Sequence, residues 1–340
     1  MRLLQAMAGA RHGGAEAFFV RLAIALQRSG QEQCILIRRN ADRAAALRRA
    51  GIDPLELRFG GAADLVTRWR FRRAIAGYRP KIVLSWMNRA TSLCPRGDFV
   101  HVARLGGYYD LKYYRRCDHL IGNTRDIVAY LKRSGWPSER AHYLPNFVAL
   151  DGAPAASRGE LDTPEDAPLA LALGRLHANK AFDVLLAALA KVPRLHLWLA
   201  GDGELRQTLE RQASAFGIAP RVRFLGWRED VAALLAAVDF LVCPSRHEPL
   251  GNVVIEAWAA RKPVIASMSE GPAALITDEV SGLLVPVDDA AALAAAMKRL
   301  VEDGGLRARL AAAGHAAYEA EFSEGRVVGL YRDFFERVAR

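Results

Sequence analysis

The stretch from Phe240 to Ser267, FLVCPSRHEPLGNVVIEAWAARKPVIAS, carries the pattern that decides the fold. A short apolar run, Phe240–Cys243, is followed by a loop containing Pro and Gly, an apolar helical segment and a second short run, Val264–Ala266. This order predicts two parallel strands joined by a helix that packs on the sheet. In such sheets ligands bind outside the carboxyl ends of the strands, so the loop after Cys243 is a candidate ligand site.

The same alternation extends over nearly the whole chain of 340 residues, a length that suits two domains of about 150 residues each. It predicts an α/β fold with two doubly wound, Rossmann-like domains. We expect strands at Arg2–Met7, Gln33–Ile37, Ile82–Trp86, Phe99–Ala103, His119–Gly122, Leu169–Leu173, His196–Ala200, Arg221–Leu225, Phe240–Cys243, Val264–Ala266 and Leu283–Val285. In the first half, helices are expected at about 14–29, 41–50, 62–77 and 124–134.

Periodicity is lost between the two halves, in the segment FVALDGAPAASRGELDTPEDAP (147–168), where Gly, Ala, Pro and acidic residues gather. We therefore predict a first domain over residues 1–150, a linker over 151–167 and a second domain over 168–322.

The composition indicates a globular protein of a reducing compartment. Hydrophobic residues make up 51% and charged residues 25% of the chain, which excludes wholesale disorder. The four cysteines are scattered and form no C-x-x-C pair, so a cytoplasmic location is expected. The N-terminus lacks the apolar run of a signal peptide, and nowhere do 18 apolar residues follow one another.

The positive charge is concentrated in the first half. Residues 1–150 hold 26 Lys and Arg against 11 Asp and Glu, a net charge of +15, whereas residues 151–340 hold 21 against 26, a net charge of −5. This asymmetry predicts an anionic partner for the first half: nucleic acid, a lipid surface or a phosphorylated substrate. No nucleic-acid-binding motif accompanies the charge, so nucleic acid is not expected.

Two glutamates in the opening stretch, Glu248 and Glu256, lie eight positions apart. On one continuous helix they would stand about 12 Å apart along the axis, too far for the carboxyl pair of most glycoside hydrolases. The turn Leu250-Gly251-Asn252-Val253 between them instead offers N–H groups at a helix N-terminus, which attract an anion. A nucleotide diphosphate sugar suits this layout, with sugar hydroxyls, diphosphate and ribose hydroxyls in line.

Two other strand ends carry candidate anion-binding residues. Arg175 and Lys180 flank the loop after Leu169–Leu173 and can neutralise a diphosphate, although two ordinary surface cations explain them about equally well. After the first strand, Gly13 and Gly14 permit a positive φ and let backbone N–H groups approach a phosphate, although a plain turn is the commoner meaning of such a pair.

Together these residues resemble the retaining glycosyltransferases of the GT-B fold, specifically the large family four that includes bacterial lipopolysaccharide and capsule enzymes. The resemblance covers almost the whole chain, and its most specific part is the pair of glutamates with the glycine between them, preceded by the Arg/Lys pair. The matching segments are HGGAE, GRLHANKAFDVLL, LAGDGELRQTLE, FLGW, SRHEPLGNVVIEAWA, ASMSEGPAALI, SGLLVPVDDAAALAAAM and FSEGRVVGLYRDFF.

The resemblance implies a role for each candidate residue. Arg175 and Lys180 bind the donor diphosphate and stabilise the leaving group, and Glu248 contacts hydroxyls of the donor sugar. The donor is further held by Gly13, Gly14, Leu250, Gly251, Asn252, Val253 and Glu256. No metal and no cofactor are expected, and Asp288-Asp289 is interpreted as the start of a helix.

The resemblance also implies a domain arrangement. The two domains face each other across an interdomain cleft, the first taking the acceptor and the second the nucleotide sugar. The hinge is placed at Leu144-Pro145-Asn146, and the helix at about 323–340 crosses back to pack on the first domain. Many relatives carry a reaction-centre His in the first domain; neither His101 nor Arg104 can be assigned to that role. Arg104, Gly106 and Gly107 are weaker candidates for lining the cleft.

The arginine-rich segments 43–51 and 65–81 interleave cations with Trp69, Phe71 and Tyr78. They are either two solvated amphipathic helices or a face that docks on anionic lipid headgroups or on a phosphorylated, lipid-linked acceptor.

The leading hypothesis is a peripheral enzyme at the inner face of the cytoplasmic membrane that transfers a sugar to a cell-envelope glycan, in particular the lipopolysaccharide core. The alternatives are a same-fold sugar nucleotide epimerase or hydrolase and a non-catalytic nucleotide-sugar or glycan-binding subunit. A nicotinamide dehydrogenase is not favoured, because no G-x-G-x-x-G follows the first strand.

Overall fold

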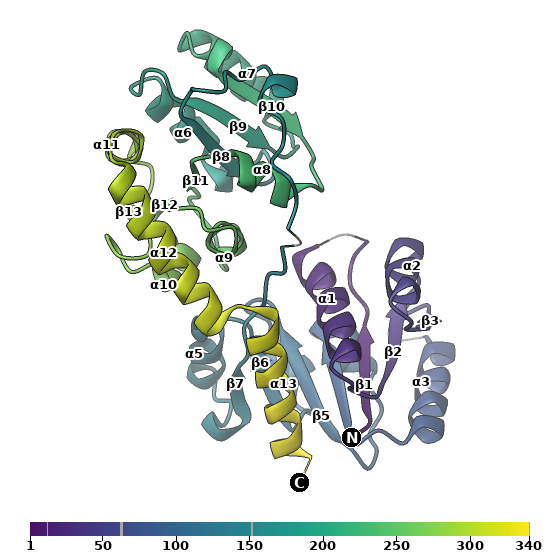
Figure 1. The fold of residues 1–340 in the computed structure, drawn as a ribbon. Coiled ribbons are helices and arrows are strands. Elements are labelled where there is room, and N and C mark those ends of the chain that lie inside the picture. Colours follow the sequence, from purple (N-terminus) through teal and green to yellow (C-terminus); the bar gives the residue numbers. More distant parts are fainter. Residues whose placement is uncertain (12, 62–63, 151, 340) are drawn as a thin grey trace. The chain divides into compact units, whose positions relative to one another are not determined.

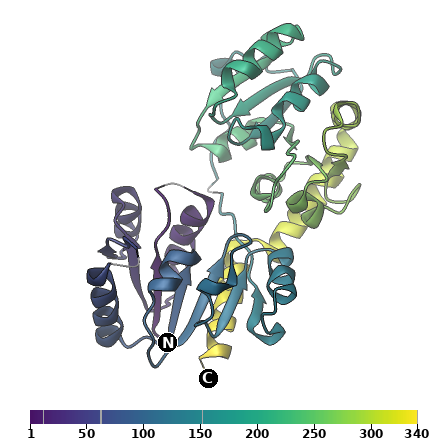
Figure 2. The ribbon, with the colours of Figure 1, turned by 180° about the vertical axis from the view of Figure 1, so that it is seen from behind.

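Two parallel β-sheets with flanking helices form the protein (Figures 1 and 2). The computed structural model describes residues 1–11, 13–61, 64–150 and 152–339. The chain divides into two compact units, one made of Met1–Phe147 and Glu324–Arg340, the other of Val148–Ser323. This is the predicted α/β architecture with two Rossmann-like sheets.

The sheet of the first unit has seven strands in the order β3-β2-β1-β4-β5-β6-β7, and all neighbours run parallel. Its strands are Leu3–Met7 (β1), Gln33–Arg38 (β2), Leu55–Leu57 (β3), Ile82–Trp86 (β4), Val100–Leu105 (β5), His119–Gly122 (β6) and Ala141–Tyr143 (β7). Its helices are Gly14–Arg28 (α1), Ala41–Arg49 (α2), Leu65–Tyr78 (α3), Met87–Leu93 (α4), Arg125–Arg133 (α5) and Glu324–Val338 (α13), with short 3-10 turns at Leu111–Tyr113 (η1) and Ser138–Arg140 (η2).

Both faces of this sheet are covered, as the alternation of side chains along β1 shows. Leu3 and Met7 belong to a core cluster that includes residues of α1 and α13. Leu4 and Ala6, which point to the opposite face, belong to a second cluster that includes residues of α3 and α4. Parallel strands of this kind carry apolar side chains on both faces, so both faces of the sheet must be covered by helices.

The C-terminal helix α13 packs against the first unit, as predicted, and a buried arginine fixes it there (Figure 1). Arg104, only 1% exposed, stacks its guanidinium over the rings of Phe18 and Trp86 at 4.6 and 4.7 Å. Its Nε donates to the hydroxyl of Tyr331 on α13 at 2.8 Å, and its Nη2 donates to Asn146. Arg104 is therefore a structural residue that joins α1, α13 and the end of the first unit.

The sheet of the second unit has six parallel strands in the order β10-β9-β8-β11-β12-β13. Its strands are Leu169–Leu173 (β8), His196–Ala200 (β9), Val222–Gly226 (β10), Phe240–Cys243 (β11), Val264–Ser267 (β12) and Leu283–Val285 (β13). Its helices are Phe182–Leu189 (α6), Arg206–Ala215 (α7), Val231–Ala237 (α8), Asn252–Ala259 (α9), Glu270–Leu275 (α10), Ala290–Glu302 (α11) and Gly304–Glu321 (α12), with 3-10 turns at Gly159–Leu161 (η3), Ala178–Lys180 (η4) and Ala219–Arg221 (η5). Its core again falls into one apolar cluster on each face of the sheet.

The predicted strands all appear, each within two residues of its expected bounds, but two strands were missed. The missed strands, β3 and β7, have three residues each and lie at the two edges of the first sheet. Three residues are too few to show an alternation of apolar and polar side chains. The predicted helix at 62–77 corresponds to α3, and positions 62 and 63 lie outside the described residues.

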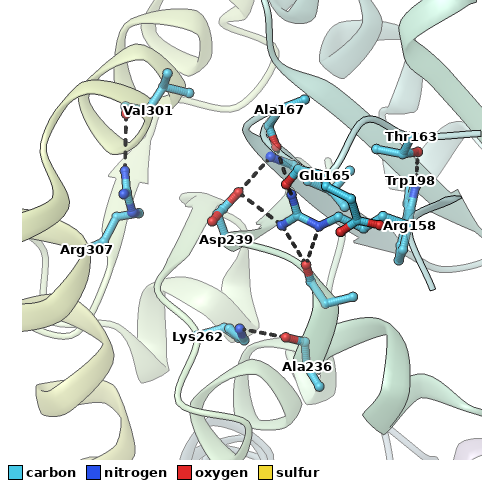
Figure 3. Close-up of polar contacts among 12 residues, drawn as sticks. Arg158, Thr163, Glu165, Ala167, Trp198, Ala236, Asp239, Lys262, Val301 and Arg307 are labelled. Atoms are coloured by element: carbon cyan, nitrogen blue, oxygen red, sulfur yellow. Dashed lines mark hydrogen bonds and ion pairs between the residues drawn. The ribbon is translucent and has the colours of Figure 1, made fainter. Parts of the chain in front are cut away.

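The segment expected to be a linker, residues 151–167, is packed on the second unit from Ala156 onward, where Ala156 N–H donates to Ala233 O at 3.0 Å (Figure 3). Arg158 donates through Nε and Nη2 to the carbonyl of Ala237 at 3.1 and 2.7 Å, and it lies 3.6 Å from Asp239. Its Nη1 donates to the carbonyls of Glu165 and Ala167. One partly buried guanidinium thus holds a stretch whose composition alone indicates a loose connection.

The change from one unit to the other falls between Phe147 and Val148, just after the Leu144-Pro145-Asn146 turn. Phe147 packs edge-on against Phe18 with ring centroids 5.3 Å apart. Val148 belongs to the second unit, where its N–H donates to the carbonyl of Phe322 and its carbonyl accepts from Tyr318.

We expect acid to destabilise the first unit through His101. This side chain is 5% exposed, its Nε2 lies 2.9 Å from Ser85 Oγ, and burial lowers its pKa to about 4. Because the folded pKa lies below the ordinary value of 6.5, stability is complete above pH 6.5 and falls as the pH drops from 6.5 toward 4. The loss should be on the order of 2 kcal/mol at pH 5, measured by chemical denaturation at pH 7.5 and 5.

The variant His101→Gln should show a smaller loss between these two pH values, whereas His247→Gln, which replaces a half-exposed histidine of the second unit, should keep it. Equal pH dependence in all three proteins would contradict the assignment.

Candidate active site

The loop after β8 carries Arg175 and Lys180 and rests on the Gly201-Asp202-Gly203 turn that follows β9. Gly174 N–H donates to Ala200 O, and Leu176 N–H donates to Asp202 O, both at 3.0 Å. A Cβ at Gly201 would lie 1.9 Å from Gly174 O, so only glycine permits this close approach. The side chain of Asp202 accepts from Gly203 N–H within the turn at 2.8 Å. The turn fixes the backbone that presents the two cations.

Lys180 and Glu248 form an ion pair that joins the ends of β8 and β11, which are neighbours in the sheet. The Lys180 Nζ contacts Glu248 Oε2, and the two side chains are 23% and 12% exposed. The other carboxylate oxygen, Oε1, accepts from Gly251 N–H at 3.3 Å. The pair therefore holds a cation at the carboxyl edge of the sheet, directly before a helix.

That helix, α9, presents a free N-terminus at the same place. Gly251 stands before its first residue with φ 70°, a left-handed conformation that favours glycine. The first N–H groups of a helix have no partner within it and carry the positive end of the helix dipole. Asn252 begins the helix, and its buried Oδ1 has no hydrogen-bond partner among the described residues. The position suits a phosphate.

A second glycine shapes this loop from below. Gly271 N–H donates to Glu248 O at 2.7 Å, and a Cβ on Gly271 would lie 2.5 Å from that oxygen, 2.6 Å from Leu250 C and 2.8 Å from Gly251 N. Gly271 lies in the segment ASMSEGPAALI, and the local sequence pattern gives it no role. The contact joins Gly271 to the backbone of a loop at least 20 residues earlier in the chain, so the sequence around Gly271 shows no sign of it beyond the glycine itself.

Arg246, also missed, clamps the two strand-end loops together. Its guanidinium donates to both carboxylate oxygens of Asp183 at 2.9 and 2.7 Å and lies 2.6 Å from Asp288. Its backbone N–H donates to Asn179 O at 2.8 Å. Although burial acts in the opposite direction, the hydrogen bonds from Arg246 lower the pKa of Asp183 below its ordinary value. The arginine lies two residues before Glu248 in the same motif, which is the signal that could have identified it.

The other candidates of the second unit lie on the same loops. Arg175 follows β8, is exposed and forms no ion pair with another described residue. Leu250 and Val253 flank the start of α9, and Glu256 lies in its second turn, half-buried. The structure thus joins Lys180 to Glu248 directly.

In the first unit the Gly13-Gly14 turn opens onto α1, but the positive φ expected of its glycines is not observed. Gly13 has φ 169°, which is extended, and Gly14 is not among the residues with positive φ. Glu16, 8% exposed, instead lies beneath the loop and accepts from Ala10 N–H at 2.7 Å. A Cβ on Gly13 would lie 2.3 Å from Glu16 Oε2, so close approach of the carboxylate explains that glycine.

Neither first-domain candidate for the reaction centre lies where one is expected. His101 is buried at the amino-terminal end of β5, away from the carboxyl edge where ligands bind. Arg104 is nearer that edge but is enclosed by Phe18, Trp86 and Tyr331. Gly106 and Gly107 follow β5 and are partly exposed.

The acidic pair Asp288-Asp289 has structural partners. Asp289 caps α11 by accepting from the N–H groups of Ala291 and Ala292, as its interpretation as a helix start predicted, and Asp288 pairs with Arg246. Within the described parts of the chain, no group of three or more His, Cys, Asp or Glu side chains is arranged to hold a metal ion.

The two doubly wound sheets, with a fixed cation, a carboxylate and a helix N-terminus at one strand edge, define the class of GT-B glycosyltransferases. Residues 12–151 match the family model described as Glycosyltransferase Family 4, and residues 167–303 match the one described as Glycosyl transferases group 1. The chain is 37% identical to the lipopolysaccharide core biosynthesis glycosyltransferases LpsE and LpsD of Rhizobium meliloti (strain 1021), across 94% and 96% of its own length and 95% of each relative.

Among solved structures, that of Anabaena Alr3699/HepE in complex with UDP covers 99% of this chain and 100% of its own, with a TM-score of 0.86 and 19% identity. It shows that the fold is shared. The protein belongs to glycosyltransferase family 4.

The variant Gly271→Ala should displace the loop of Glu248 because its Cβ meets backbone atoms that have no room to move. We expect a loss of roughly 1–3 kcal/mol in the free energy of unfolding, as for other overpacked sites, and loss of glycosyl transfer. Gly304→Ala, whose Cβ meets only the flexible end of Arg307 at 3.5 Å, is the matched control. Wild-type stability and activity in Gly271→Ala would contradict the description of the site.

Proposed function

We propose that the protein is a retaining, metal-independent hexosyltransferase that moves a sugar from a nucleotide diphosphate donor to a cell-envelope glycan, in lipopolysaccharide core biosynthesis. The observation that carries the proposal is the Lys180–Glu248 pair beside the N-terminus of α9. The names of LpsE and LpsD support the lipopolysaccharide core as the acceptor. Since HepE was solved with UDP, uridine diphosphate sugars are the first donors to test.

In this proposal each group of the second unit meets one part of the donor. The diphosphate lies at the first N–H groups of α9, and Lys180 and Arg175 neutralise the charge that develops as the bond to the sugar breaks. Glu248, held by Lys180 and Gly251, accepts hydrogen bonds from sugar hydroxyls, and Glu256 accepts them from the ribose. Leu250, Asn252 and Val253 line the phosphate.

The first unit, residues 1–150 of the predicted division, contributes the acceptor side and the donor-binding Gly13 and Gly14. Two side-chain cations and a helix end supply the positive charge that a divalent ion would otherwise give, so activity should persist in EDTA. Retention is tested by the anomeric configuration of the product, read by proton NMR.

The alternatives make different predictions in the same assay. A sugar nucleotide epimerase or hydrolase consumes the donor without an acceptor, whereas a non-catalytic subunit binds the donor and releases no free nucleotide. Acceptor-dependent nucleotide release separates transfer from both.

Removing either partner of the ion pair should abolish transfer. Lys180→Ala removes the cation nearest the leaving group, and the loss of one such stabilising group typically lowers kcat by about 100- to 1000-fold. Glu248→Gln keeps the shape but weakens its hold on Lys180 and on the sugar, and a loss of similar size is expected. The measurement is nucleotide release with a purified lipopolysaccharide acceptor across a panel of uridine diphosphate sugars.

Lys191→Ala serves as the control, because Lys191 is an exposed lysine of the same unit that is outside the site. Circular dichroism melts of all variants separate loss of activity from loss of folding. If folded Lys180→Ala and Glu248→Gln both transfer at the wild-type rate, the proposed site is wrong.

We also propose that the enzyme is peripheral, acting at the inner face of the cytoplasmic membrane through α3. In that helix Leu65, Val66 and Trp69 are 73%, 55% and 58% exposed. Arg70, Arg72 and Arg73 are exposed beside them, and Arg73 lies over the ring of Trp69 at 5.5 Å. Apolar side chains among cations are the composition of a surface that meets anionic lipid. None of the described helices has the length and apolar character that crossing a bilayer requires.

The double variant Arg72→Gln/Arg73→Gln should bind vesicles containing phosphatidylglycerol about 30-fold more weakly, at about 1 kcal/mol per cation. Sedimentation with anionic and with neutral vesicles measures this. Arg28→Gln/Arg332→Gln removes the same charge from exposed positions of the same unit and should bind normally. Equal binding of the wild type to neutral vesicles would exclude electrostatic docking.

A further inference from the structure

A hollow of about 400 Å³ opens at the carboxyl ends of β1 and β2 in the first unit. Four of its lining residues are arginines, contributed by the loops after the two strands and by α2. Its lining consists of Gly9, Ala10, Arg11, Arg38, Arg39, Asn40, Ala41, Asp42 and Arg43. We call it the β1–β2 arginine pocket.

Arg43 forms the buried wall of this pocket and has an unused donor. The residue is 5% exposed, and its Nη2 donates to Ala10 O at 2.7 Å. Its Nη1 is shielded from solvent and has no hydrogen-bond partner among the described residues. Burial lowers the pKa of Arg43, while the charge of Glu16 acts in the opposite direction. A buried guanidinium with an unpaired donor is a group that a bound anion can satisfy after a small movement of the loop.

The remaining groups of the pocket add positive charge at its mouth. Arg38 and Arg39 are exposed and form no ion pair with another described residue. Asp42 is the acidic residue of the lining and lies 4.0 Å from Arg11. The N-terminus of α2, where Asn40 accepts from Arg43 N–H at 2.8 Å, faces the same space and contributes its dipole.

We propose that the β1–β2 arginine pocket binds a phosphate group carried by the acceptor sugar. Guanidinium groups match phosphate oxygens two at a time, and a cluster of four arginines against one carboxylate favours a multiply charged oxyanion over a neutral sugar. The inference rests on the proposed glycosyltransferase function and specifies the substrate: a phosphorylated glycan.

The acceptor is favoured over the donor because the donor diphosphate already has its own cations. Arg175 and Lys180 belong to the second unit, where Lys180 is paired with Glu248 just before α9. The pocket lies in the first unit and has four arginines of its own. The bulk of the charge excess of the chain is in that unit, as a substrate bearing phosphate requires.

Binding to the full chain tests this by calorimetry with three probes. Glucose 6-phosphate stands for a phosphorylated sugar and glucose for its neutral counterpart, while UDP reports on the donor site. Arg38→Gln/Arg39→Gln removes two of the three exposed arginines of the pocket and leaves Arg11 and the buried Arg43 in place. We expect glucose 6-phosphate to bind the wild type, glucose not to bind, and the double variant to lose at least about tenfold in affinity for glucose 6-phosphate while binding UDP normally.

The charge-matched variant Arg28→Gln/Arg332→Gln should bind glucose 6-phosphate like the wild type. Unchanged affinity for glucose 6-phosphate in Arg38→Gln/Arg39→Gln would overturn the proposal, and so would an equal loss of that affinity in the control variant. A loss of UDP binding in Arg38→Gln/Arg39→Gln would also overturn it, because the pocket would then belong to the donor site. Loss of binding to phosphatidylglycerol vesicles in place of glucose 6-phosphate would assign it to a lipid headgroup. Failure of UDP to bind the wild type would count against the proposed function while leaving the sugar-phosphate result readable.

Discussion

The ion pair between Lys180 and Glu248 is the constraint around which the second unit is organised. The pair forms only when the loops after β8 and β11 lie against each other, and the surrounding contacts hold these loops in place. Gly201 allows the first loop to rest on the turn after β9, Gly271 supports the second from below, and Arg246 links the two. Each of these contacts is made by a backbone atom or a fixed guanidinium, so the pair is held by rigid parts of the fold.

A partly buried ion pair is a poor device for stability alone, since removing two charges from water offsets much of their attraction. The position of the pair, at the carboxyl edge of the sheet just before α9, suggests a role in catalysis. The carboxylate, which also accepts from Gly251 N–H just before α9, keeps the lysine in one position before any substrate arrives. Preorganised positive charge at the point where a leaving group becomes negative is the largest contribution that a protein makes to this kind of chemistry. The same logic, with four arginines in place of one lysine, applies to the pocket of the first unit.

Much of the fold could be predicted from the sequence because it depends on local pattern. The apolar runs mark the buried strands, and the opening stretch from Phe240 to Ser267 places Glu248 before a helix. What was missed depends on contacts between distant residues. The short edge strands β3 and β7 have no periodicity of their own, and the segment between Arg158 and Ala167 is held by Arg158 through carbonyls that any residue could provide. The positive φ expected at Gly13 is absent, and the carboxylate of Glu16 beneath it leaves no mark in the local sequence pattern.

The most direct measurement of the central claim is a crystal structure of the protein with UDP bound. The account predicts that the distal phosphate lies at the N-terminus of α9, within hydrogen-bond distance of the N–H groups of Asn252 or Val253 and of Lys180 Nζ, with the ribose hydroxyls on Glu256. A diphosphate bound elsewhere, with Lys180 still paired to Glu248 and the helix end bare, would contradict it.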